Sequence, residues 1–436
     1  MTLNGRRRLA ALVILVATGC VTQKGDPGAS QGGSGGSGGG PGGDGGFLQI
    51  DDVWDAGDSS GEAGSGSAIA CDATAAVAAM RIGWNLGNSL DSVSDQPDAA
   101  AETGWGNPMV TADLFKLVAS SGFGVVRIPV TWIGRFGPGP DYAISPTFIA
   151  RVEEIVGYAL DQGLYVIINV HHDGGSGVKG KWINLTDSSN QVTAVNNERV
   201  LTQFQAIWAQ IAGRFRNYDE HLIFESMNEV SGSGSTPIQA YYDQINALNQ
   251  AFVKTVRTAG GNNWTRCLVV PGYNTNIDYT VAGFKLPKDV SAGKLILSAH
   301  YYDPWSFAGT GTTHAWGAGN PGIDNWGQES WVQGQIAKLT ASYINQGLPV
   351  IWGEYGAINQ TGYESYRHYY MEYVTKAAHD AGIVPIVWDD NNWYGSGNDA
   401  FGFLNRNSNT IQYPTIMDAM MRAVTSTYTL ADVTKP

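Results

Sequence analysis

Eight short apolar runs recur along the chain, each bounded by glycine, proline or polar residues. They read MRIGWNL, GVVRIPV, LYVIINV, LIFESM, CLVVPGY, KLILSAH, LPVIWGE and IVPIVW. Helical stretches separate most of the runs, and the pattern predicts helices over Phe148 to Leu160, Leu201 to Phe215 and Tyr366 to Ala381. Nearly continuous apolar strands that alternate with helices are typical of a buried parallel sheet.

The number of these units predicts the fold class. Eight strand–helix units in roughly 350 residues fit an α/β protein of the (β/α)₈ TIM barrel type. Gly122, Gly163, Gly347 and Gly382 each stand where a helix is expected to end before the next strand. The alternative is a doubly wound open sheet, but the first strand is followed by NLGNSLD, which lacks the glycine-rich pattern of a phosphate-binding loop.

The N-terminal part of the chain has a different composition. Arginines at 6 to 8 and the apolar run from Leu9 to Ala17 predict an export signal over residues 1–20, since the run is too short for a membrane span of roughly 20 residues. The run ends in Ala-Thr-Gly-Cys, which places Cys20 where a bacterial lipoprotein signal has its lipidated cysteine. An ordinary secretory signal and twin-arginine export are the alternatives.

Residues 21–67 are rich in Gly, Ser and Asp, and they predict a flexible tether without a core of its own. The catalytic barrel domain is expected to span residues 68–436. We therefore expect an exported protein, held at the cell surface or outer membrane through Cys20, or else secreted.

The net charge of the chain limits the kinds of molecule that it can bind. The formal net charge is −13, and an acidic protein repels phosphate backbones, so we expect no nucleic acid partner. We expect a monomer that contacts membrane only through a lipid on Cys20.

Cys71 and Cys267 could pair in an oxidising compartment, but Cys267 opens an apolar run, where a buried free thiol is the commoner outcome. We therefore expect no disulfide.

Polar side chains gather where the apolar runs end. In a (β/α)₈ barrel the active site lies at the C-terminal ends of the strands, so these side chains are expected to face one another across the barrel mouth. They are Asn85, Asn88, Asp91, Arg127, His171, His172, Asn228, Glu229, His300, Tyr302, Glu354, Trp388, Asp389 and Asp390.

Two of these residues, Glu229 and Glu354, suit glycoside hydrolysis. One carboxyl group, held protonated, donates to the departing glycosidic oxygen, while the other, ionised, attacks the anomeric carbon. The environments of the two groups must separate their pKa values. We expect Arg127 to hold Glu354 ionised through its positive charge, and Tyr302 to donate a hydrogen bond to the same carboxylate.

Several of these residues have simpler structural interpretations. Asn228 suits the sugar 2-hydroxyl, but an Asn-Glu pair is also a common helix cap. Trp388 suits stacking under a pyranose ring, but a lone tryptophan is usually core. Arg127 inside an apolar strand also fits an ion pair with a buried structural carboxylate.

Metal chemistry is the other alternative at the strand ends. The doublet His171–His172 offers two zinc ligands, but no third ligand stands at the spacing of an HExxH motif. We therefore expect no metal and no cofactor.

Eight sequence motifs together resemble glycoside hydrolase family 5, most nearly its subfamily 4 endoglucanases and xyloglucanases. The resemblance runs from Met80 to Trp388, and the remainder to Val424 fits the last barrel helix. It implies a retaining mechanism on a (β/α)₈ barrel without a cofactor. The motifs are IGWNLGNSLD, ETGWGNP, GFGVVRIPVTW, VIINVHHD, IFESMNEV, SAHYYDPWSF, VIWGEYGA and IVWDDN.

The resemblance also implies roles for single residues. Glu229 in the Asn-Glu pair resembles the acid/base, and Glu354 in WGEYG resembles the nucleophile. Positions that match the rest of the family's active site are Arg127, His171, Asn228, His300, Tyr302 and Trp388. Residues that resemble additional sugar contacts are Asn88, Asp91 and His172, with Trp316 as an aromatic near the cleft.

The expected activity is cleavage of internal bonds in β-1,4-glucans, meaning cellulose derivatives, mixed-linkage glucan or xyloglucan. A mannanase or a xylan-active hydrolase on the same barrel is an alternative, because substrate preference depends on loops. An alternative from another class is a surface protein that binds glucan without cleaving it.

Overall fold

The computed structural model describes residues 70–93, 102–175, 177–234, 236–394 and 400–436. The predicted signal at 1–20, with Cys20, and the predicted tether at 21–67 lie outside these ranges. Within the described residues, no helix is both long enough and apolar enough to cross a membrane.

Eight parallel strands close into a barrel in sequence order, with β1 paired to both β2 and β8. Every apolar run contributes one strand, so the predicted (β/α)₈ fold is confirmed. The strands are β1 (Gly83–Asn85), β2 (Val125–Ile128), β3 (Tyr165–Asn169), β4 (Leu222–Glu225), β5 (Leu268–Pro271), β6 (Leu295–Tyr301), β7 (Val350–Tyr355) and β8 (Val384–Val387). A small antiparallel pair, β9 (Leu404–Asn405) and β10 (Thr410–Ile411), follows the barrel.

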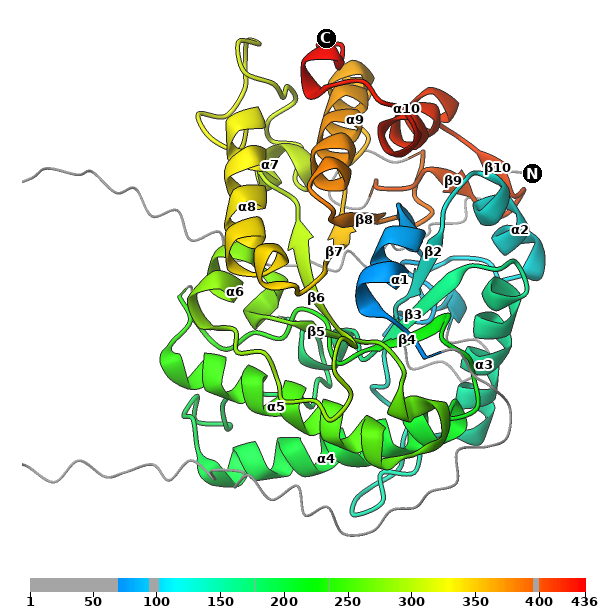
Figure 1. The fold of residues 1–436 in the computed structure, drawn as a ribbon, viewed down its shortest axis with the longest axis vertical. Helices are drawn as coiled ribbons and strands as arrows, with labels where there is room; N and C mark the ends of the chain where they lie inside the picture. The colour runs from blue at the N-terminus through cyan, green and yellow to red at the C-terminus, as the bar shows by residue number, and fades with distance from the viewer. Residues whose placement is uncertain (1–69, 94–101, 176, 235, 395–399) are drawn as a thin grey trace, which may run out of the picture.

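Helices surround the barrel on its outer side (Figure 1). The three helices predicted from periodicity are present as α3, α4 and α9; their ends differ from the predicted ones by at most two residues, except that α4 begins seven residues earlier, at Ala194. The helices are α1 (Ala73–Met80), α2 (Ala112–Ser120), α3 (Pro146–Leu160), α4 (Ala194–Arg214), α5 (Gln239–Thr258), α6 (Ile277–Gly283), α7 (Trp305–Ala308), α8 (Glu329–Ser342), α9 (Glu364–Asp380) and α10 (Pro414–Thr425).

Helix α3 shows how local sequence sets these boundaries. Ser145 caps its first turn by accepting a hydrogen bond from the Phe148 backbone N–H, and Pro146 occupies the first helical turn, where its missing N–H costs nothing. The helix is followed by Gly163 in the left-handed region at φ 73°, a conformation that glycine adopts without strain.

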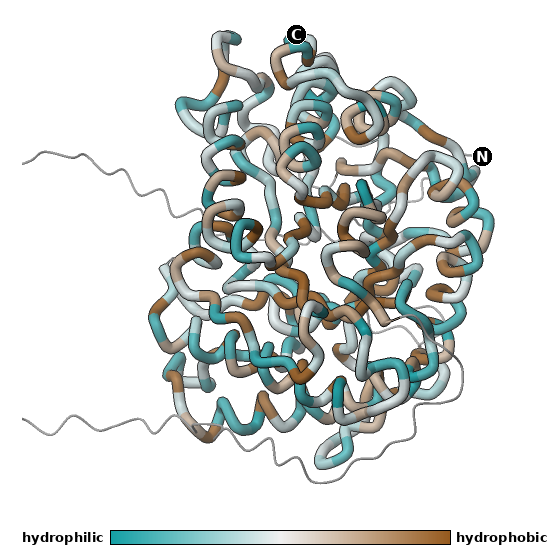
Figure 2. The backbone as a smooth tube through the Cα atoms, in the orientation of Figure 1, coloured by the Kyte–Doolittle hydropathy of each residue, from teal (hydrophilic) through white to brown (hydrophobic). Residues whose placement is uncertain are grey.

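The barrel strands alternate their side chains between the barrel interior and the layer under the helices. On β2, Val125 packs inside with α1, while Val126 belongs to the larger core under the helices. Figure 2 shows the hydrophobic colour concentrated along the strands in the middle of the molecule. The aliphatic layer inside the barrel consists of Val125, Ile167, Ile223, Val269, Ile296, Ile351, Val384 and Ile386.

Helix α1 closes the N-terminal end of the barrel, where Ala73, Ala76, Val77 and Met80 pack against this aliphatic layer. Just before α1, Cys71 forms a disulfide with Cys267, at the start of β5. The prediction of no disulfide is therefore wrong. The two cysteines are 196 residues apart, and they meet only because α1 folds back across the end of the barrel.

Candidate active site

The interior of the barrel becomes polar two residues beyond its aliphatic layer. Because side chains on one face of a strand repeat every second residue, Arg127 follows Val125 into the interior, and Glu225 follows Ile223. Arg127 and Glu225 are both fully buried. This polar layer lies toward the C-terminal ends of the strands, where a barrel of this type carries its active site.

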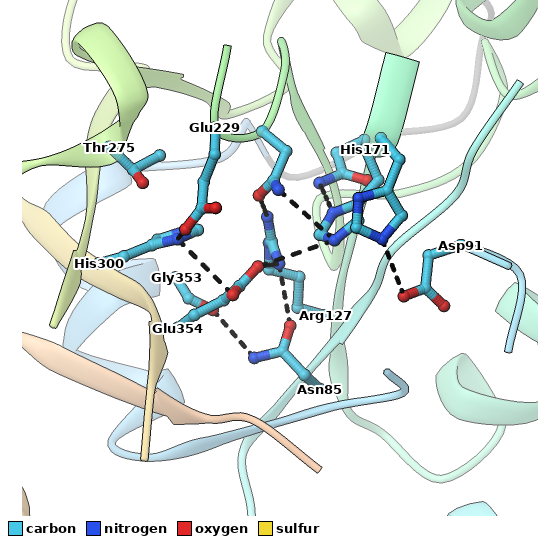
Figure 3. A network of polar contacts seen from close by, with 12 residues as sticks. Asn85, Asp91, Arg127, His171, Glu229, Thr275, His300, Gly353 and Glu354 are labelled. Atoms are coloured by element: carbon cyan, nitrogen blue, oxygen red, sulfur yellow. Dashed lines mark hydrogen bonds and ion pairs between the residues drawn. The ribbon is translucent and has the colours of Figure 1, made fainter. Parts of the chain in front are cut away.

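Arg127 lies at the centre of this layer and binds four side chains from β1, from β4 and the loop after it, and from β7 (Figure 3). Its Nε donates to Glu225 Oε2 at 2.7 Å, and its Nη2 donates to Asn228 Oδ1 at 2.8 Å. Its Nη1 donates to Asn85 Oδ1 at 3.0 Å and to Glu354 Oε1 at 2.9 Å. Both interpretations of Arg127 therefore hold, because it contacts the expected Glu354 and also pairs with a buried carboxylate.

A register shift in β7 places Glu354 at the mouth. The pairing of β7 with β8 shifts between Trp352 and Tyr355, and an irregularity of this kind re-aims a side chain. Gly353 lies in this shift, and an added Cβ there would lie 2.6 Å from Ser298 Oγ. Tyr302 donates its hydroxyl hydrogen to Glu354 Oε2 at 3.1 Å, as the sequence predicted.

Glu229, on the loop after β4, faces Glu354 across the mouth. His300 Nδ1 lies 2.8 Å from Glu229 Oε1 and 3.6 Å from Glu354 Oε2. One carboxylate oxygen of each glutamate and a nitrogen of His300 all lie within 4.8 Å of one another. The two glutamates therefore approach each other more closely than the roughly 6.5–9.5 Å between the carboxyl groups of inverting glycosidases, and this gap is near that of retaining ones, about 5–5.5 Å.

The two glutamates differ in exposure and in their charged neighbours. The side chain of Glu229 is 40% exposed and that of Glu354 is 8% exposed. Burial raises the pKa of Glu354, and the positive charges of His300 and Arg127 only partly offset it. Burial acts on Glu229 in the same direction, but the hydrogen bond and the positive charge of His300 outweigh it and lower the pKa of Glu229.

The order of the two pKa values in the empty site is thus the reverse of the one expected from Arg127 alone, because Glu229 makes the closer contact with His300. Cleavage of a glycosidic bond by this pair requires the opposite order, with the proton on Glu229.

His171 lies behind Glu354, with its Nε2 3.9 Å from Glu354 Oε1. Burial, together with the charges of His172 and Arg127, lowers the pKa of His171 well below its usual range, so the ring is neutral. Its ring is parallel to that of Trp388 at a centroid distance of 5.8 Å. Trp388 keeps part of its surface exposed, as a platform for a sugar ring requires.

The loop after β1 contains two of the predicted sugar contacts, Asn88 and Asp91, and the third, His172, follows β3. Asp91 is fully buried and accepts the backbone N–H groups of Ser89 at 2.7 Å and Asn88 at 3.0 Å, so it shapes the loop instead of contacting a sugar. Asn88 and His172 remain partly exposed. His172 Nε2 lies 3.7 Å from Asp91 Oδ2, and its ring lies 5.5 Å from that of Trp105.

Trp316 requires a correction. Its ring is fully buried against Tyr369, Tyr370 and Tyr373 of α9, and its indole N–H donates to the Gly327 carbonyl at 2.8 Å. No face of this ring is free to stack on a sugar, so its position near the cleft was predicted wrongly. Trp316 is a packing residue in this structure.

Two sets of possible metal ligands occur at the mouth, Asp91 with His171 and His172, and Glu229 with His300 and Glu354. In the first set, Asp91 is already bound by two backbone N–H groups. In the second, the Arg127 guanidinium bound to Glu354 repels a further cation. The arrangement at the mouth suits acid/base and nucleophilic chemistry by the side chains themselves.

Sequence reasoning passed over three residues of the site: Glu225, Asn169 and Trp105. Glu225 and Asn169 are the last residues of β4 and β3. In the sequence, however, the apolar runs LIFESM and LYVIINV continue past them, so neither residue was recognised as a strand end. Their inward register, two residues after Ile223 and Ile167, was the available signal. Trp105 stands inside the ETGWGNP motif, which was noted only as a resemblance.

Comparison with known proteins places this barrel in a family. The model of the cellulase family, glycosyl hydrolase family 5, matches residues 92–394. Endoglucanase A of Paenibacillus barcinonensis is 40% identical over 368 residues, which cover 80% of this chain and 89% of that protein. The xyloglucan-specific endo-β-1,4-glucanase of Bacteroides ovatus is 37% identical over 332 residues, which cover 72% of this chain and 64% of that protein.

Solved structures agree with this placement. A family 5 xyloglucanase from Paenibacillus pabuli superimposes with a TM-score of 0.74 at 41% identity, covering 80% of this chain and 99% of that one. A broad-specificity endoglucanase of subfamily 4 from Bacteroides salanitronis superimposes with a TM-score of 0.76 at 39% identity, covering 83% and 97%. Taken with the two glutamates that face each other across the barrel mouth, these matches show that the chain belongs to glycosyl hydrolase family 5, the cellulase family.

Proposed function

We propose that the protein is a retaining endo-β-1,4-glucanase, which cleaves internal bonds of β-1,4-glucans by double displacement. The observation that supports this most directly is the short gap between the carboxylate oxygens of Glu229 and Glu354, within 4.8 Å. Such a gap leaves no room for a water molecule between the second carboxylate and the sugar, as an inverting reaction requires.

In the first step, Glu354 attacks the anomeric carbon and forms a glycosyl–enzyme ester, while Glu229 transfers its proton to the departing glycosidic oxygen. Glu354 suits the nucleophile because Arg127 and Tyr302 each bind one of its oxygens and fix its direction. Glu229 suits the acid because its more exposed side chain reaches the leaving group.

In the second step, water attacks the anomeric carbon and gives its proton to Glu229, and the ester bond to Glu354 breaks. Glu229 is then protonated and Glu354 is ionised, as at the start. Asn228, held by Arg127 at 2.8 Å, keeps its amide N–H₂ group available to the sugar 2-hydroxyl. Trp388 supports the ring of the bound sugar from its exposed face.

We propose soluble cellulose derivatives, mixed-linkage glucan and xyloglucan as substrates, supported by the endoglucanase and xyloglucanase relatives. Initial rates on carboxymethyl cellulose, barley β-glucan, xyloglucan, mannan and xylan test this choice. The highest rate is expected on one of the three glucans. A highest rate on mannan or xylan would show instead a mannanase or a xylan-active hydrolase on the same barrel.

Catalysis itself is tested with Glu229→Gln. We expect the release of reducing ends from glucan to fall by about 10²–10⁴-fold, because the glycosidic oxygen loses its proton donor. With 2,4-dinitrophenyl β-cellobioside, whose leaving group needs no proton, the first step should stay close to the wild-type rate. Glu372→Gln, which changes a buried carboxylate on α9, is the matched control and should keep full activity.

A protein that binds glucan without cleaving it would release no reducing ends even as the wild type. Full activity of Glu229→Gln on polymer would contradict the assignment of the acid/base. The two readouts therefore separate failure of the activity from failure of the residue assignment.

We also propose that residues 1–20 direct export, that Cys20 carries a lipid, and that the chain is a monomer. The Cys71–Cys267 disulfide supports export, since disulfides persist in oxidising compartments. Incorporation of labelled palmitate into the wild type, and its loss in Cys20→Ser, is the expected result. Equal labelling of both proteins would contradict lipidation at Cys20.

A further inference from the structure

Glu225 is a buried carboxylate that the reaction described above does not use. It lies on β4, four residues before Glu229, and its side chain is completely buried. Its Oε2 accepts two hydrogen bonds, from Arg127 Nε at 2.7 Å and from Asn169 Nδ2 at 2.9 Å. Its Oε1 has no hydrogen-bond partner among the described residues. Since burying a charge is costly, the presence of this carboxylate inside the barrel, with one oxygen left without a partner among the described residues, requires an explanation.

The first contact of Glu225 fixes Arg127. A guanidinium that donates through Nε to one carboxylate and through Nη1 to another has its plane held at both ends. Without the bond at Nε, Arg127 would keep contacts only at its tip, with Asn85, Asn228 and Glu354. Glu225 therefore sets the direction from which Arg127 meets the nucleophile.

The second contact reaches His171 through Asn169. Asn169 Oδ1 accepts from the Val130 backbone N–H at 3.1 Å, which fixes the orientation of the amide group. Its Nδ2 therefore donates to Glu225 Oε2 and also to His171 Nδ1, at 3.2 Å. The ring of His171 is thereby held with its Nε2 3.9 Å from Glu354 Oε1 and 3.5 Å from Asn228 Nδ2.

The charge of Glu225 matters as well as its shape. Arg127 supplies one positive charge to two carboxylates, Glu225 and Glu354. Because Glu225 neutralises part of that charge, less of it is left to stabilise an ionised Glu354. The ionisable groups that face Glu354 are Arg127 from β2, His171 after β3, Glu229 after β4, and His300 and Tyr302 from β6 and its end.

We propose that Glu225 is a positioning residue for the nucleophile: it orients Arg127 and the His171 ring toward Glu354, and its negative charge limits how strongly Arg127 stabilises the Glu354 carboxylate. The proposal rests on the proposed function, since it assigns Glu354 as the nucleophile. The side chain of Glu225 thus has two effects, one through its geometry and one through its charge, and a separate variant tests each of them.

Glu225→Gln keeps an acceptor oxygen for Arg127 and Asn169 but removes the charge. The acidic limb of kcat/KM against pH reports the ionisation of the nucleophile in the free enzyme. We expect this limb to move to lower pH by about half to one unit, with little change of kcat at the optimum.

Glu225→Asp keeps the charge but shortens the side chain, so the carboxylate withdraws from Arg127 and Asn169. We expect kcat to fall by about 10–100-fold with KM little changed, because the nucleophile loses its alignment. The acidic limb should stay where it is in the wild type. Both variants are measured with 2,4-dinitrophenyl β-cellobioside, which reports formation of the glycosyl–enzyme independently of the preferred polymer.

Asp289→Asn is the matched control. Asp289, between α6 and β6, pairs at 2.6 Å with the buried Arg257 in the last turn of α5, so the pair lies at the N-terminal end of the barrel, away from the mouth. We expect this variant to lower the melting temperature, and to change neither kcat nor the position of the acidic limb of kcat/KM against pH.

If Glu225 only stabilises the fold, both of its variants will behave like Asp289→Asn, and the proposal is overturned. If Glu225→Gln does not fold, Glu225→Asp decides alone, and an unchanged kcat in the folded protein overturns the proposal. A wild type that does not turn over the aryl cellobioside would instead refute the proposed function.

Discussion

The two ends of the barrel interior are built on the same strands but follow different physical rules. At the N-terminal end, Ile223 and its aliphatic neighbours pack against α1, and the Cys71–Cys267 disulfide joins α1 to β5. Two residues further along the same strand, Glu225 belongs to a buried network of charges and amides. A step of about 7 Å along a strand thus separates a layer that stabilises the fold from one that is expensive to bury.

The two layers contribute differently to stability and to activity. A buried ion pair often stabilises a protein less than apolar side chains of the same volume would, so the polar layer is retained for its chemistry. The aliphatic layer and the disulfide offset its cost. Substitutions at the mouth should therefore change activity more than stability, and substitutions at the closed end should do the reverse.

The largest effect is expected at the mouth, from Glu354→Ala. Activity on glucan should fall on the order of 10⁵-fold, because the glycosyl–enzyme no longer forms. Thermal unfolding should show a folded protein. Steady-state assays on barley β-glucan measure the loss, and residual activity above about 1% of wild type would contradict the role of Glu354.

At the closed end, Ile223→Ala should have the opposite profile. Removing these buried atoms leaves a cavity, and we expect the free energy of unfolding to fall by about 2–5 kcal/mol. Urea denaturation measures this loss, and kcat per folded molecule should equal that of the wild type. A large drop of kcat would show that the two layers are coupled and would break the comparison.

The disulfide gives a second test at the closed end. Replacing both cysteines, Cys71→Ala with Cys267→Ala, should lower the free energy of unfolding by about 2–4 kcal/mol, because the unfolded chain loses a constraint. Activity at low temperature should remain at the wild-type level. A reducing agent should destabilise the wild type and leave the double variant unaffected; equal sensitivity of both would argue against the disulfide.

The smallest effect concerns the pH dependence of stability at the mouth. Burial raises the pKa of Asp173 to about 6, against the hydrogen bonds donated by the Trp132 backbone and the Trp182 indole. Since the folded state holds this proton more tightly than the unfolded chain, the stabilising contribution is complete below about pH 4 and is lost as the pH rises through 6.

Asp173→Asn removes this titration. The difference in unfolding free energy between wild type and variant should therefore change in favour of the variant by at most about 3 kcal/mol between pH 4 and pH 7.5. Denaturant titrations at several pH values measure it. A difference that stays constant with pH would mean that Asp173 titrates normally in the folded protein.

Much of this organisation could be predicted from the sequence, because it depends on local patterns. Each apolar run became a strand, and the residues that end the runs, among them Arg127, Glu229 and Glu354, meet at one mouth. Strand ends in a closed parallel barrel converge whatever the details of side-chain packing, so their order along the chain was sufficient.

The errors concern contacts that no local pattern encodes. The disulfide depends on where α1 packs, and the burial of Trp316 depends on three tyrosines of α9. Asp91 has the composition of a sugar ligand, but the tight turn of its own loop directs its carboxylate to backbone N–H groups. Glu225 was passed over because it lies within an apolar run, where only its register, two residues after Ile223, indicates that it faces the barrel interior.

The stereochemistry of the first product distinguishes double displacement through Glu354 from single displacement by water. Proton NMR during the earliest phase of cello-oligosaccharide hydrolysis distinguishes the two anomers before they interconvert. If Glu354 forms a covalent glycosyl–enzyme across the short gap from Glu229, the β anomer appears first. Early appearance of the α anomer would show single displacement by water and would contradict the assignment of both glutamates.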